Sequence, residues 1–273
     1  IAFDTGVTES RKHAIKLAAG AIDLGYRRLM VLGGDGTLNE VVNGIFRQDT
    51  VPTDEVLLCK MGVGTGDDFS RTMGISPEYE RVVDYLDAVQ TKIIDAGKVT
   101  YTENGEQKEH YYVNVAGMLL DAAITERANR NRWIPGKFAY YWALAATALT
   151  FKKKQIKLTV DGREHQIKAY NLNVGNCQYA GGGMCVAPDA VPNDGLLDVT
   201  VVGDVTPWEV LQTFPKIGDG SFVYHPKVHQ YKGRTIRIES KEGPLKIEVE
   251  GEELGYTPIT IELLPERIKV VVP

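Results

Sequence analysis

Residues 29–37, with the sequence LMVLGGDGT, decide the fold of the first half of the chain. The four apolar residues run without a polar interruption, as in a strand of a parallel sheet that is covered on both faces. From Leu38 to Phe46, apolar residues recur at helical spacing, so the glycines occupy a strand-to-helix turn. Such a turn directs backbone N–H groups and the positive end of a helix at one point, which suits the binding of phosphate.

The same plan is repeated further along the chain. Residues 56–59 (VLLC) form a second apolar strand, residues 62–69 (GVGTGDDF) a second glycine-rich loop, and a helix is predicted at about 78–89. Strands that alternate with helices over short connections predict a doubly wound α/β layer, with ligands beyond the carboxyl ends of the strands. A single Gly-Gly-Asp-Gly is also compatible with a plain tight turn. Two such loops after two apolar strands favour a polyphosphate site along one edge.

The second half of the chain has a different pattern. Alternating apolar residues at 156–160, the Asp161-Gly162 turn and a return strand to 167 predict a β-hairpin. Further strands are predicted at 111–115, 170–174, 197–202, 235–239, 245–249, 259–263 and 268–272. We therefore expect an N-terminal doubly wound α/β nucleotide-binding domain (1–97) followed by a C-terminal β-sandwich domain (98–264). The last strand, at about 265–273, is expected to return to the first domain.

A helix rich in aromatic residues is predicted at 136–151, directly before Lys152, Lys153, Lys154 and Lys157. Aromatic stripes are usually buried, so a core helix is one interpretation. The helix and the lysines together are also compatible with docking on an anionic membrane. A third possibility is that the lysines protect an edge strand from pairing.

Composition excludes several classes of protein. The chain has 31 Lys+Arg against 36 Asp+Glu, a formal net charge of -5, so nucleic acid is not an expected partner. Three cysteines without a CxxC pair favour a reducing, cytoplasmic compartment. The longest apolar stretch, 138–151, is shorter than the ~20 residues of a membrane-spanning helix. The chain begins at Ile1 without an initiator Met, so a preceding segment is expected.

Residues 33–44 (GGDGTLNEVVNG) resemble the signature of the diacylglycerol kinase catalytic domain, which bacterial diacylglycerol kinases share with sphingosine and ceramide kinases. Residues 62–71 (GVGTGDDFSR) are similar to the family's Pro-x-Gly-Thr-x-Asn-Asp-Phe-Ala-Arg. Gly62 stands in place of the Pro, and Asp67 in place of the first Asn, where it adds a negative charge near the expected phosphates. The resemblance implies ATP and Mg²⁺ as cofactors, with the nucleotide contacted by Gly33, Gly34, Asp35, Gly36, Thr37, Asn39, Glu40, Gly64, Thr65, Asp67 and Asp68.

Two further segments are similar to motifs of this family. Residues 187–199 (APDAVPNDGLLDV) resemble a turn that holds a structural Mg²⁺, which implicates the Asp194 carboxylate and the carbonyls of Val191 and Leu196. A plain Asn-Asp-Gly turn is the alternative. Residues 250–252 (EGE) resemble the family's Asp-Gly-Glu, whose Glu is the proposed general base. The resemblance therefore implies Glu252 in that role, with Glu250 replacing the Asp.

Taken together, these motifs predict an ATP-dependent lipid kinase that phosphorylates diacylglycerol or a similar long-chain alcohol. Asp35 and Asp68 are expected to hold Mg²⁺ or its water shell beside the phosphates, and Asp35 and Glu252 to be catalytic. The protein is expected at the inner membrane surface as a peripheral protein, and a homodimer is left open.

Two rival functions remain at this point. NAD kinase shares the Gly-Gly-Asp-Gly-Thr loop, although the Asp68-Phe69 and Asp194-Gly195 pairs favour the lipid kinases. The other rival is a non-catalytic lipid-binding or regulatory protein that has kept the kinase fold. It is favoured by Gly62, by Asp67 and by residues 118–120 (MLL), where the family tends to have Gly-x-Gly-Phe.

Overall fold

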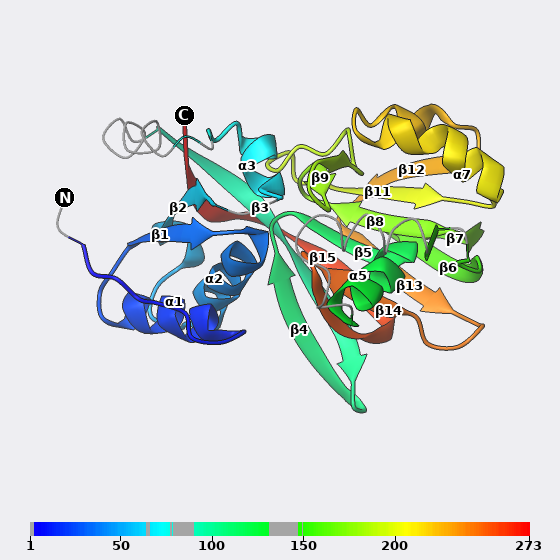
Figure 1. Ribbon diagram of the computed structural model, residues 1–273. Helices are drawn as coiled ribbons and strands as arrows, with labels where there is room; N and C mark the ends of the chain where they lie inside the picture. The colour runs from blue at the N-terminus through cyan, green and yellow to red at the C-terminus, as the bar shows by residue number, and fades with distance from the viewer. Residues whose placement is uncertain (1–2, 64–65, 77, 79–89, 131–146, 149) are drawn as a thin grey trace.

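The computed structural model describes residues 3–63, 66–76, 78, 90–130, 147–148 and 150–273. It consists of an α/β lobe and a larger β-rich lobe, joined by two long strands (Figure 1). The helix predicted at 78–89 lies outside the described residues apart from its first residue. The aromatic helix predicted at 136–151 also lies mostly outside them. Among the described residues, no helix is long and apolar enough to cross a membrane.

The α/β lobe confirms the strand–loop–helix plan of the first half. Its elements are α1 (His13–Asp23), β1 (Arg28–Gly33), α2 (Asp35–Arg47), η1 (Thr53–Glu55), β2 (Leu57–Gly62) and α3 (Asp68–Met73). β1 and β2 are parallel, and their last residues, Gly33 and Gly62, lie opposite each other in the register. The two glycine loops therefore begin side by side at one edge of the sheet.

Helices α1 and α2 pack closely in this lobe because of one glycine. A Cβ atom on Gly44 of α2 would lie 2.6 Å from the carbonyl oxygen of Ile15 and 2.7 Å from the Cβ of Ala18, both on α1. Ala14, Ala18 and Ile22 of α1 share one buried core with apolar residues of α2 and β1. This packing fixes the direction of α2, whose N-terminus follows the first loop.

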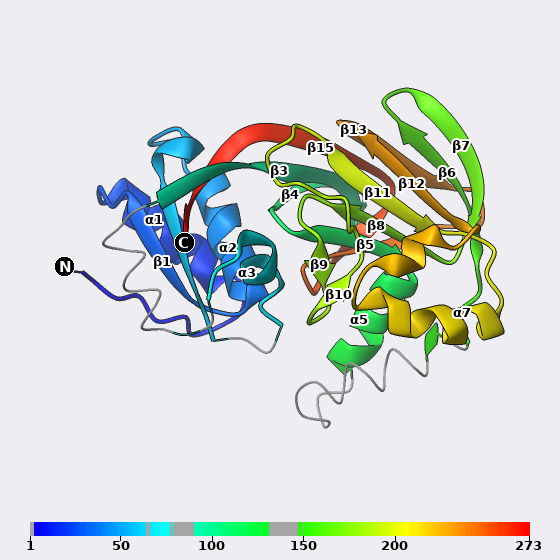
Figure 2. The ribbon, with the colours of Figure 1, turned by 90° about the horizontal axis from the view of Figure 1, so that it is seen from above.

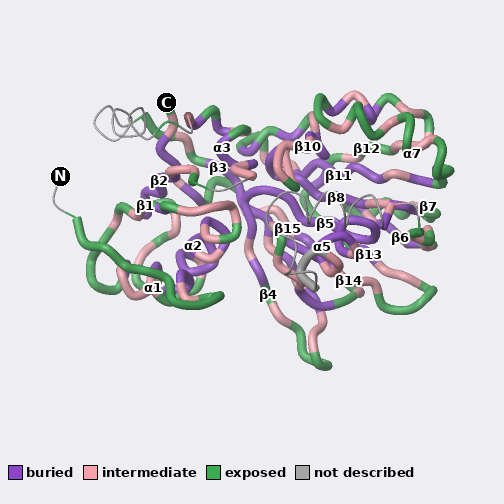
Figure 3. Tube along the Cα trace, in the orientation of Figure 1, coloured by how far each residue is buried: buried purple, intermediate pink, exposed green. Residues whose placement is uncertain are grey.

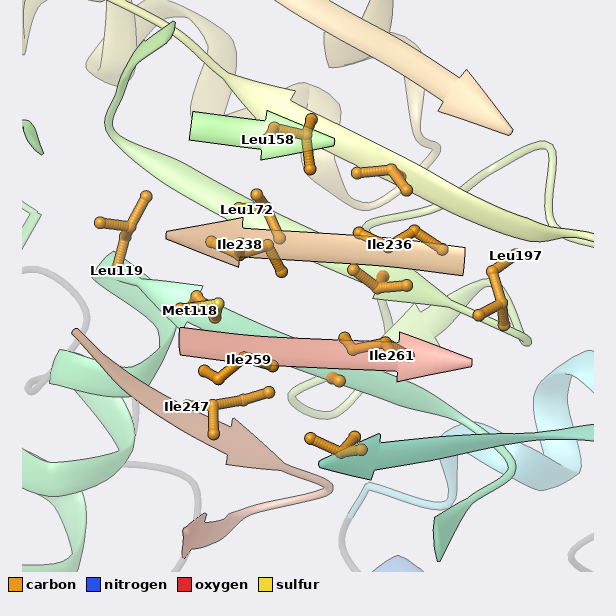
Figure 4. Close-up of a cluster of buried hydrophobic side chains, with 14 of the residues drawn as sticks. Met118, Leu119, Leu158, Leu172, Leu197, Ile236, Ile238, Ile247, Ile259 and Ile261 are labelled. Atoms are coloured by element: carbon orange, nitrogen blue, oxygen red, sulfur yellow. The ribbon is translucent and has the colours of Figure 1, made fainter. Parts of the chain in front are cut away.

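Most strands of the β-rich lobe lie along one hydrogen-bonded path, whereas β4 joins the same sheet through β3, and β9 and β10 form a separate two-stranded sheet. The order along the sheet is β12-β11-β8-β5-β14-β15-β13-β6-β7. The apolar side chains that it encloses include Met118, Leu172, Ile236 and Ile259 (Figure 4). Its elements are β4 (Glu106–Tyr112), β5 (Val115–Leu119), α5 (Leu120–Arg130), β6 (Lys154–Val160), β7 (Arg163–Ala169), β8 (Asn171–Gly175), β9 (Tyr179–Ala180), β10 (Met184–Cys185), β11 (Leu197–Val202), α7 (Pro207–Thr213), η2 (Phe214–Ile217), η3 (Ser221–Tyr224), β12 (Val228–Gly233), β13 (Thr235–Ser240) and β14 (Lys246–Val249).

Two long strands, β3 (Gln90–Glu103) and β15 (Glu252–Val272), connect the lobes as an antiparallel pair. β15 pairs with β13 and β14 in one lobe and, through Lys269 and Val270, runs parallel to β2 in the other. The C-terminus therefore lies beside the α/β lobe (Figures 1 and 2). β3 was not predicted, and it runs without a break across residue 97, where the sequence analysis divides the chain. That division stays a proposal.

The hairpin predicted at 156–167 is confirmed, with β6 and β7 antiparallel and Ile156 opposite Ile167. The strand predicted at 111–115 is wrong in its extent, because β4 ends at Tyr112 and β5 begins at Val115. The backbone N–H groups at this break are bound by a side chain from a distant turn, described below. Buried residues are concentrated in β5, β8, β11 and α2, whereas α7 and the N-terminal segment are largely exposed (Figure 3).

The lysines after the aromatic segment do not protect an edge strand. Lys154 and Lys157 lie on β6, which is covered on one side by β13 and on the other by β7. Lys157 pairs with Glu164 (2.6 Å), and Lys153 pairs with Asp204 (2.5 Å). Much of the positive charge in this cluster is therefore neutralised by neighbouring carboxylates.

Candidate active site

The first glycine loop is shorter than predicted, because α2 already begins at Asp35 with Gly34 as its N-cap. The N–H of Leu38 donates the first hydrogen bond of the helix to the carbonyl of Gly34 (3.1 Å). The N–H groups of residues 35–37 come before this bond, so the helix itself offers them no acceptor. These are the N–H groups that a helix leaves for an external acceptor. Gly33 is required here, since a Cβ atom on it would lie 2.8 Å from Thr37.

The carboxylate of Asp35 ties the second loop to the first. One oxygen accepts the N–H of Asp68 (3.0 Å) and the other the N–H of Phe69 (3.3 Å), both in the first turn of α3. The structure thus brings Asp35 and Asp68 together, with Asp67 next to them as the N-cap residue of α3. Gly64 and Thr65 lie outside the described residues.

Asp68 connects this loop to the β-rich lobe. Its carboxylate accepts the N–H of Gly182 (2.8 Å) and of Gly183 (2.6 Å), and the residue is only 4% exposed. Burial raises the pKa of Asp68, and the nearby charge of Asp35 raises it further. A Cβ atom on Gly66 would lie 3.2 Å from Asp35 and 3.5 Å from Gly182. Three glycine-containing segments therefore converge around Asp35 and Asp68.

Two residues predicted to contact the nucleotide make structural contacts away from the loop. Asn39 is buried in α2, where its amide donates to the carbonyl of Tyr111 (3.1 Å) and its oxygen lies 2.8 Å from Nε2 of His110. Glu40 accepts the N–H groups of Lys12 (2.8 Å) and Ala14 (3.0 Å) at the start of α1. Asn39 thus fastens α2 to β4, and Glu40 supplies the cap that α1 lacks in its own N-cap residue.

Glu250, in the turn between β14 and β15, is a site residue that sequence reasoning missed. Its Oε1 accepts the N–H groups of Val113 (3.0 Å) and Asn114 (2.7 Å), at the break between β4 and β5. Its Oε2 is buried and has no hydrogen-bond partner among the described residues. Burial, together with the charge of Asp35, raises the pKa of Glu250 to about 8. The sequence feature that could have identified Glu250 is its position as the first acidic residue of the Asp-Gly-Glu-like turn.

Glu252, the predicted base, faces a different neighbour. Its carboxylate lies 2.8 Å from the ammonium of Lys12, and its side chain is 24% exposed. The hydrogen bond to Glu252 raises the pKa of Lys12. Of the two acids in this turn, Glu252 is thus the one that retains access to solvent, and the Glu250 carboxylate is enclosed.

Two more buried acids, unnoticed in the sequence, continue from Glu250 into the β-rich lobe. Asp121 lies in the first turn of α5, directly after β5, and Glu248 lies on the neighbouring strand β14. A Cβ atom on Gly117 would lie 2.3 Å from Asp121 and 2.5 Å from Glu248, so only glycine leaves room for both carboxyl groups. Burial raises the pKa of Asp121 to about 6 and that of Glu248 well above its usual value. Burial thus shifts both groups towards the protonated form, relative to an exposed carboxyl group.

The predicted metal turn is closed by its own hydrogen bonds. Asp194 accepts the N–H of Leu196 (3.0 Å), and its own N–H donates to the carbonyl of Val191 (3.2 Å). Lys232 lies 3.1 Å from a carboxylate oxygen of Asp198 and 3.9 Å from one of Asp194. No group of three or more His, Cys, Asp or Glu side chains with metal-binding geometry occurs in the part of the chain that the structure describes.

The turn nevertheless retains one feature that suits a cation. Oδ2 of Asp198 is buried without a hydrogen-bond partner among the described residues, and Asp194 is close enough to raise the pKa of Asp198. Burial is the larger cause of that shift. Mg²⁺ commonly keeps several waters and needs only one or two carboxylates, so Asp194 and Asp198 fit it if Lys232 moves aside.

Two family models match this chain. The family model of the diacylglycerol kinase catalytic domain matches residues 1–99, and that of the YegS C-terminal NAD kinase beta sandwich-like domain matches residues 114–272. A diacylglycerol kinase of Staphylococcus aureus (strain bovine RF122 / ET3-1) is 30% identical over 270 residues, which are 97% of this chain and 81% of the relative. This chain belongs to the diacylglycerol kinase family.

A diacylglycerol kinase of Mycobacterium tuberculosis (strain ATCC 25618 / H37Rv) is 28% identical over 259 residues, 94% of this chain and 80% of the relative. Among solved structures, a diacylglycerol kinase from Bacillus anthracis str. Sterne superposes with a TM-score of 0.70 at 22% identity, over 97% of this chain and 83% of that one. Yeast NADH kinase superposes with a TM-score of 0.50 at 13% identity, over 91% and 62%. These two likenesses show the shared fold.

The diacylglycerol kinase family consists of lipid kinases, which transfer phosphate to an alcohol. Membership confirms the resemblance expected from residues 33–44, and the α/β lobe followed by a β-rich sandwich confirms the predicted fold class. The first family match ends at residue 99 and the second begins at residue 114. The turn of the β3–β4 hairpin lies between them.

Proposed function

We propose that this member of the diacylglycerol kinase family uses ATP to phosphorylate the hydroxyl group of diacylglycerol or a similar long-chain lipid alcohol. The observation that carries the proposal is the contact between Asp35 and the first turn of α3. It sets two glycine loops side by side, each leading into a helix N-terminus, where backbone N–H groups favour the phosphates of a nucleotide.

The phosphate site draws on the first turn of α2 and on the second loop. Asp35 and Asp68 are the proposed partners of Mg²⁺, which when bound neutralises charge on the transferred phosphoryl group. Asp35 fits this role better, because it is only partly buried, whereas Asp68 is 4% exposed and its carboxylate is bound by the 182–183 segment of the other lobe. We therefore assign Asp68 to holding the lobes together beside the nucleotide, and Asp35 to the metal.

The proton of the acceptor hydroxyl needs a base. In the proposed step the lipid oxygen forms a bond to the γ-phosphorus, the bond from phosphorus to the bridging oxygen of ADP breaks, and the hydroxyl proton passes to Glu252. The partial exposure of Glu252 supports this role, since a base must reach its substrate. Glu250 is less suited, because burial favours its protonated form. Its hydrogen bonds to Val113 and Asn114 instead hold the turn in place.

The remaining assignments follow from the family. We propose a structural Mg²⁺ at the turn of Asp194, with the carbonyls of Val191 and Leu196, to which the structure adds Asp198 as a candidate. A substrate embedded in a bilayer implies peripheral contact with the inner membrane surface of the cytoplasm. Contact with the membrane does not require a homodimer, and a homodimer is also compatible with it.

The decisive test is transfer of phosphate from labelled ATP in the presence of Mg²⁺ to a panel of diacylglycerol, sphingosine, ceramide and polyprenol in mixed micelles. The expected result is labelling of diacylglycerol or another long-chain alcohol, together with calorimetric binding of Mg-ATP to the protein alone. Binding of lipid without any transfer would favour the regulatory alternative. Phosphorylation of NAD in place of the lipids would instead favour the NAD kinase alternative.

A further inference from the structure

The ammonium group of Lys60 is buried between the two glycine loops. Lys60 lies on β2 and is 2% exposed, with none of its side chain reaching solvent. Its Nζ donates to the carbonyl of Gly33 at the end of β1 (3.1 Å) and forms an ion pair with Asp67 in the second loop. A buried ammonium group is costly unless it is paired and hydrogen-bonded, and these two partners meet that requirement.

Asp67 is held in place by more than this ion pair. The hydroxyl of Ser70 donates to the same carboxylate oxygen (3.0 Å), and the Asp67 side chain is only 16% exposed. The backbone of Asp67 is in the left-handed region, with a φ of 55°, which Asp adopts more readily than most residues. The carboxylate is thus directed at β2 by its local conformation as well as by Lys60.

Gly62 provides the space that this arrangement needs. A Cβ atom on Gly62 would lie 1.7 Å from Oδ2 of Asp67. The two departures from the family pattern, Gly62 for Pro and Asp67 for Asn, are therefore one arrangement. The carboxylate of Asp67 fills the space that a side chain at position 62 would take, and Lys60 supplies the opposite charge.

We propose that Lys60 is a positioning residue for the nucleotide, which acts with Gly62 and Asp67 as one unit. The unit links the two loops and offsets the negative charge that Asp67 brings to the phosphate site. The inference rests on the proposed function, because it takes the phosphates of ATP as the ligand of these loops. Without Lys60, the carboxylate of Asp67 would repel those phosphates and the link to Gly33 would be lost.

The test compares the wild type with K60M, D67N and K60M/D67N. Met matches the unbranched chain of Lys without its charge, and Asn is the residue of the family pattern. K60M leaves the Asp67 carboxylate unpaired beside the phosphates, so we expect Mg-ATP binding to weaken about tenfold or more, and to return to within about threefold of the wild type in K60M/D67N. D67N alone removes the repelling carboxylate, so it should bind Mg-ATP at least as well as the double variant. In lipid phosphorylation, KM for ATP should change more than kcat, because the bound acceptor and its base are untouched.

The matched control is the exposed pair Lys168–Asp204 (3.1 Å), remote from the loops in the β-rich lobe. K168M, D204N and their double variant should bind Mg-ATP like the wild type. A K60M variant that also binds normally, or effects that add up in K60M/D67N, would overturn the inference while the proposed function stands. A wild type that does not bind Mg-ATP would remove both.

Circular dichroism separates folding from binding. Should a single variant fail to fold, a double variant that folds and binds Mg-ATP would still support the coupling. A double variant that stays unfolded would overturn it.

Discussion

The carboxylate of Asp35 and the backbone N–H of Asp68 lie 3.0 Å apart, and this contact joins the first turn of α2 to the first turn of α3. The two residues are separated by more than thirty positions in the chain, yet each begins a helix beside the same sheet edge. A carboxylate that accepts two N–H groups is fixed in direction, which suits a group that must meet a metal–nucleotide complex in one geometry.

Replacing Asp35 with Asn should abolish most of the kinase activity. The neutral amide removes the negative charge proposed for Mg²⁺ and weakens at least one of the two hydrogen bonds to the second loop. We expect a fall in kcat of about 10²-fold or more, since electrostatic groups at a transition state have effects of that size. Steady-state assays with Asp54→Asn, an exposed acid on η1, provide the control. Equal activity of the two variants would contradict the role of Asp35.

Glu252→Gln should reduce turnover strongly and leave Mg-ATP binding nearly intact. General bases typically contribute about 10²- to 10⁴-fold, and the variant removes the proton acceptor without touching the loops. The control is Glu253→Gln, the next residue along β15, which pairs with Lys246 (2.9 Å) on the opposite face of the strand. If Glu252→Gln turns over like Glu253→Gln, the base lies elsewhere in the site.

Glu250→Gln should change how stability depends on pH. Folding raises the pKa of Glu250 from its usual value of 4.5 to about 8, chiefly because the group becomes buried. Between these values the unfolded state has lost the proton and the folded state still holds it, so wild-type stability falls as pH rises. Glu250→Gln lacks this titration. Its free energy of unfolding, measured relative to that of the wild type, should therefore increase by up to roughly 1.4 kcal/mol for each unit by which the pH is raised. Urea unfolding at pH 5, 6.5 and 8 measures it, and a constant difference would argue against a protonated Glu250.

Glu40→Ala decides between two roles for Glu40. The structure assigns it to the N-terminus of α1, where it accepts the N–H groups of Lys12 and Ala14. Loss of such a cap should cost about 0.5–2 kcal/mol of stability and leave the Kd of Mg-ATP unchanged. Chemical unfolding and calorimetry on the same preparation provide both numbers, with exposed Glu55→Ala as the control. Weaker nucleotide binding at unchanged stability would restore the nucleotide contact expected from the sequence.

Asp194→Asn tests the structural metal. If Mg²⁺ binds at this turn, it should raise the unfolding midpoint of the wild type in the absence of nucleotide, because a ligand that binds only the folded state stabilises it. The unfolding midpoint of the variant should not increase with Mg²⁺. Chelation of the metal should lower the midpoint of the wild type to that of the variant. An equal response of both proteins to Mg²⁺ would assign the stabilisation to another site.

The sequence by itself determined those features that depend on neighbouring residues. The apolar strand before Gly33, the helix after it and the hairpin at Asp161-Gly162 were all predicted, because periodicity and turn chemistry act over a few residues. The same local patterns predicted that the 33–37 and 66–68 segments lie at one edge of the sheet, because the carboxyl ends of neighbouring parallel strands lie at the same edge.

Only the tertiary structure decided how the site is completed. Glu250 reaches Val113 and Asn114 across 136 and more positions, and Asp68 reaches Gly182 across 114. The ion pair of Lys60 with Asp67 spans only seven positions. Its role at the phosphate site nevertheless depends on the burial of Lys60 and on its hydrogen bond to Gly33 of the neighbouring strand. Burial and pairing between distant segments set the charge and direction of these groups, and no local pattern carries that information.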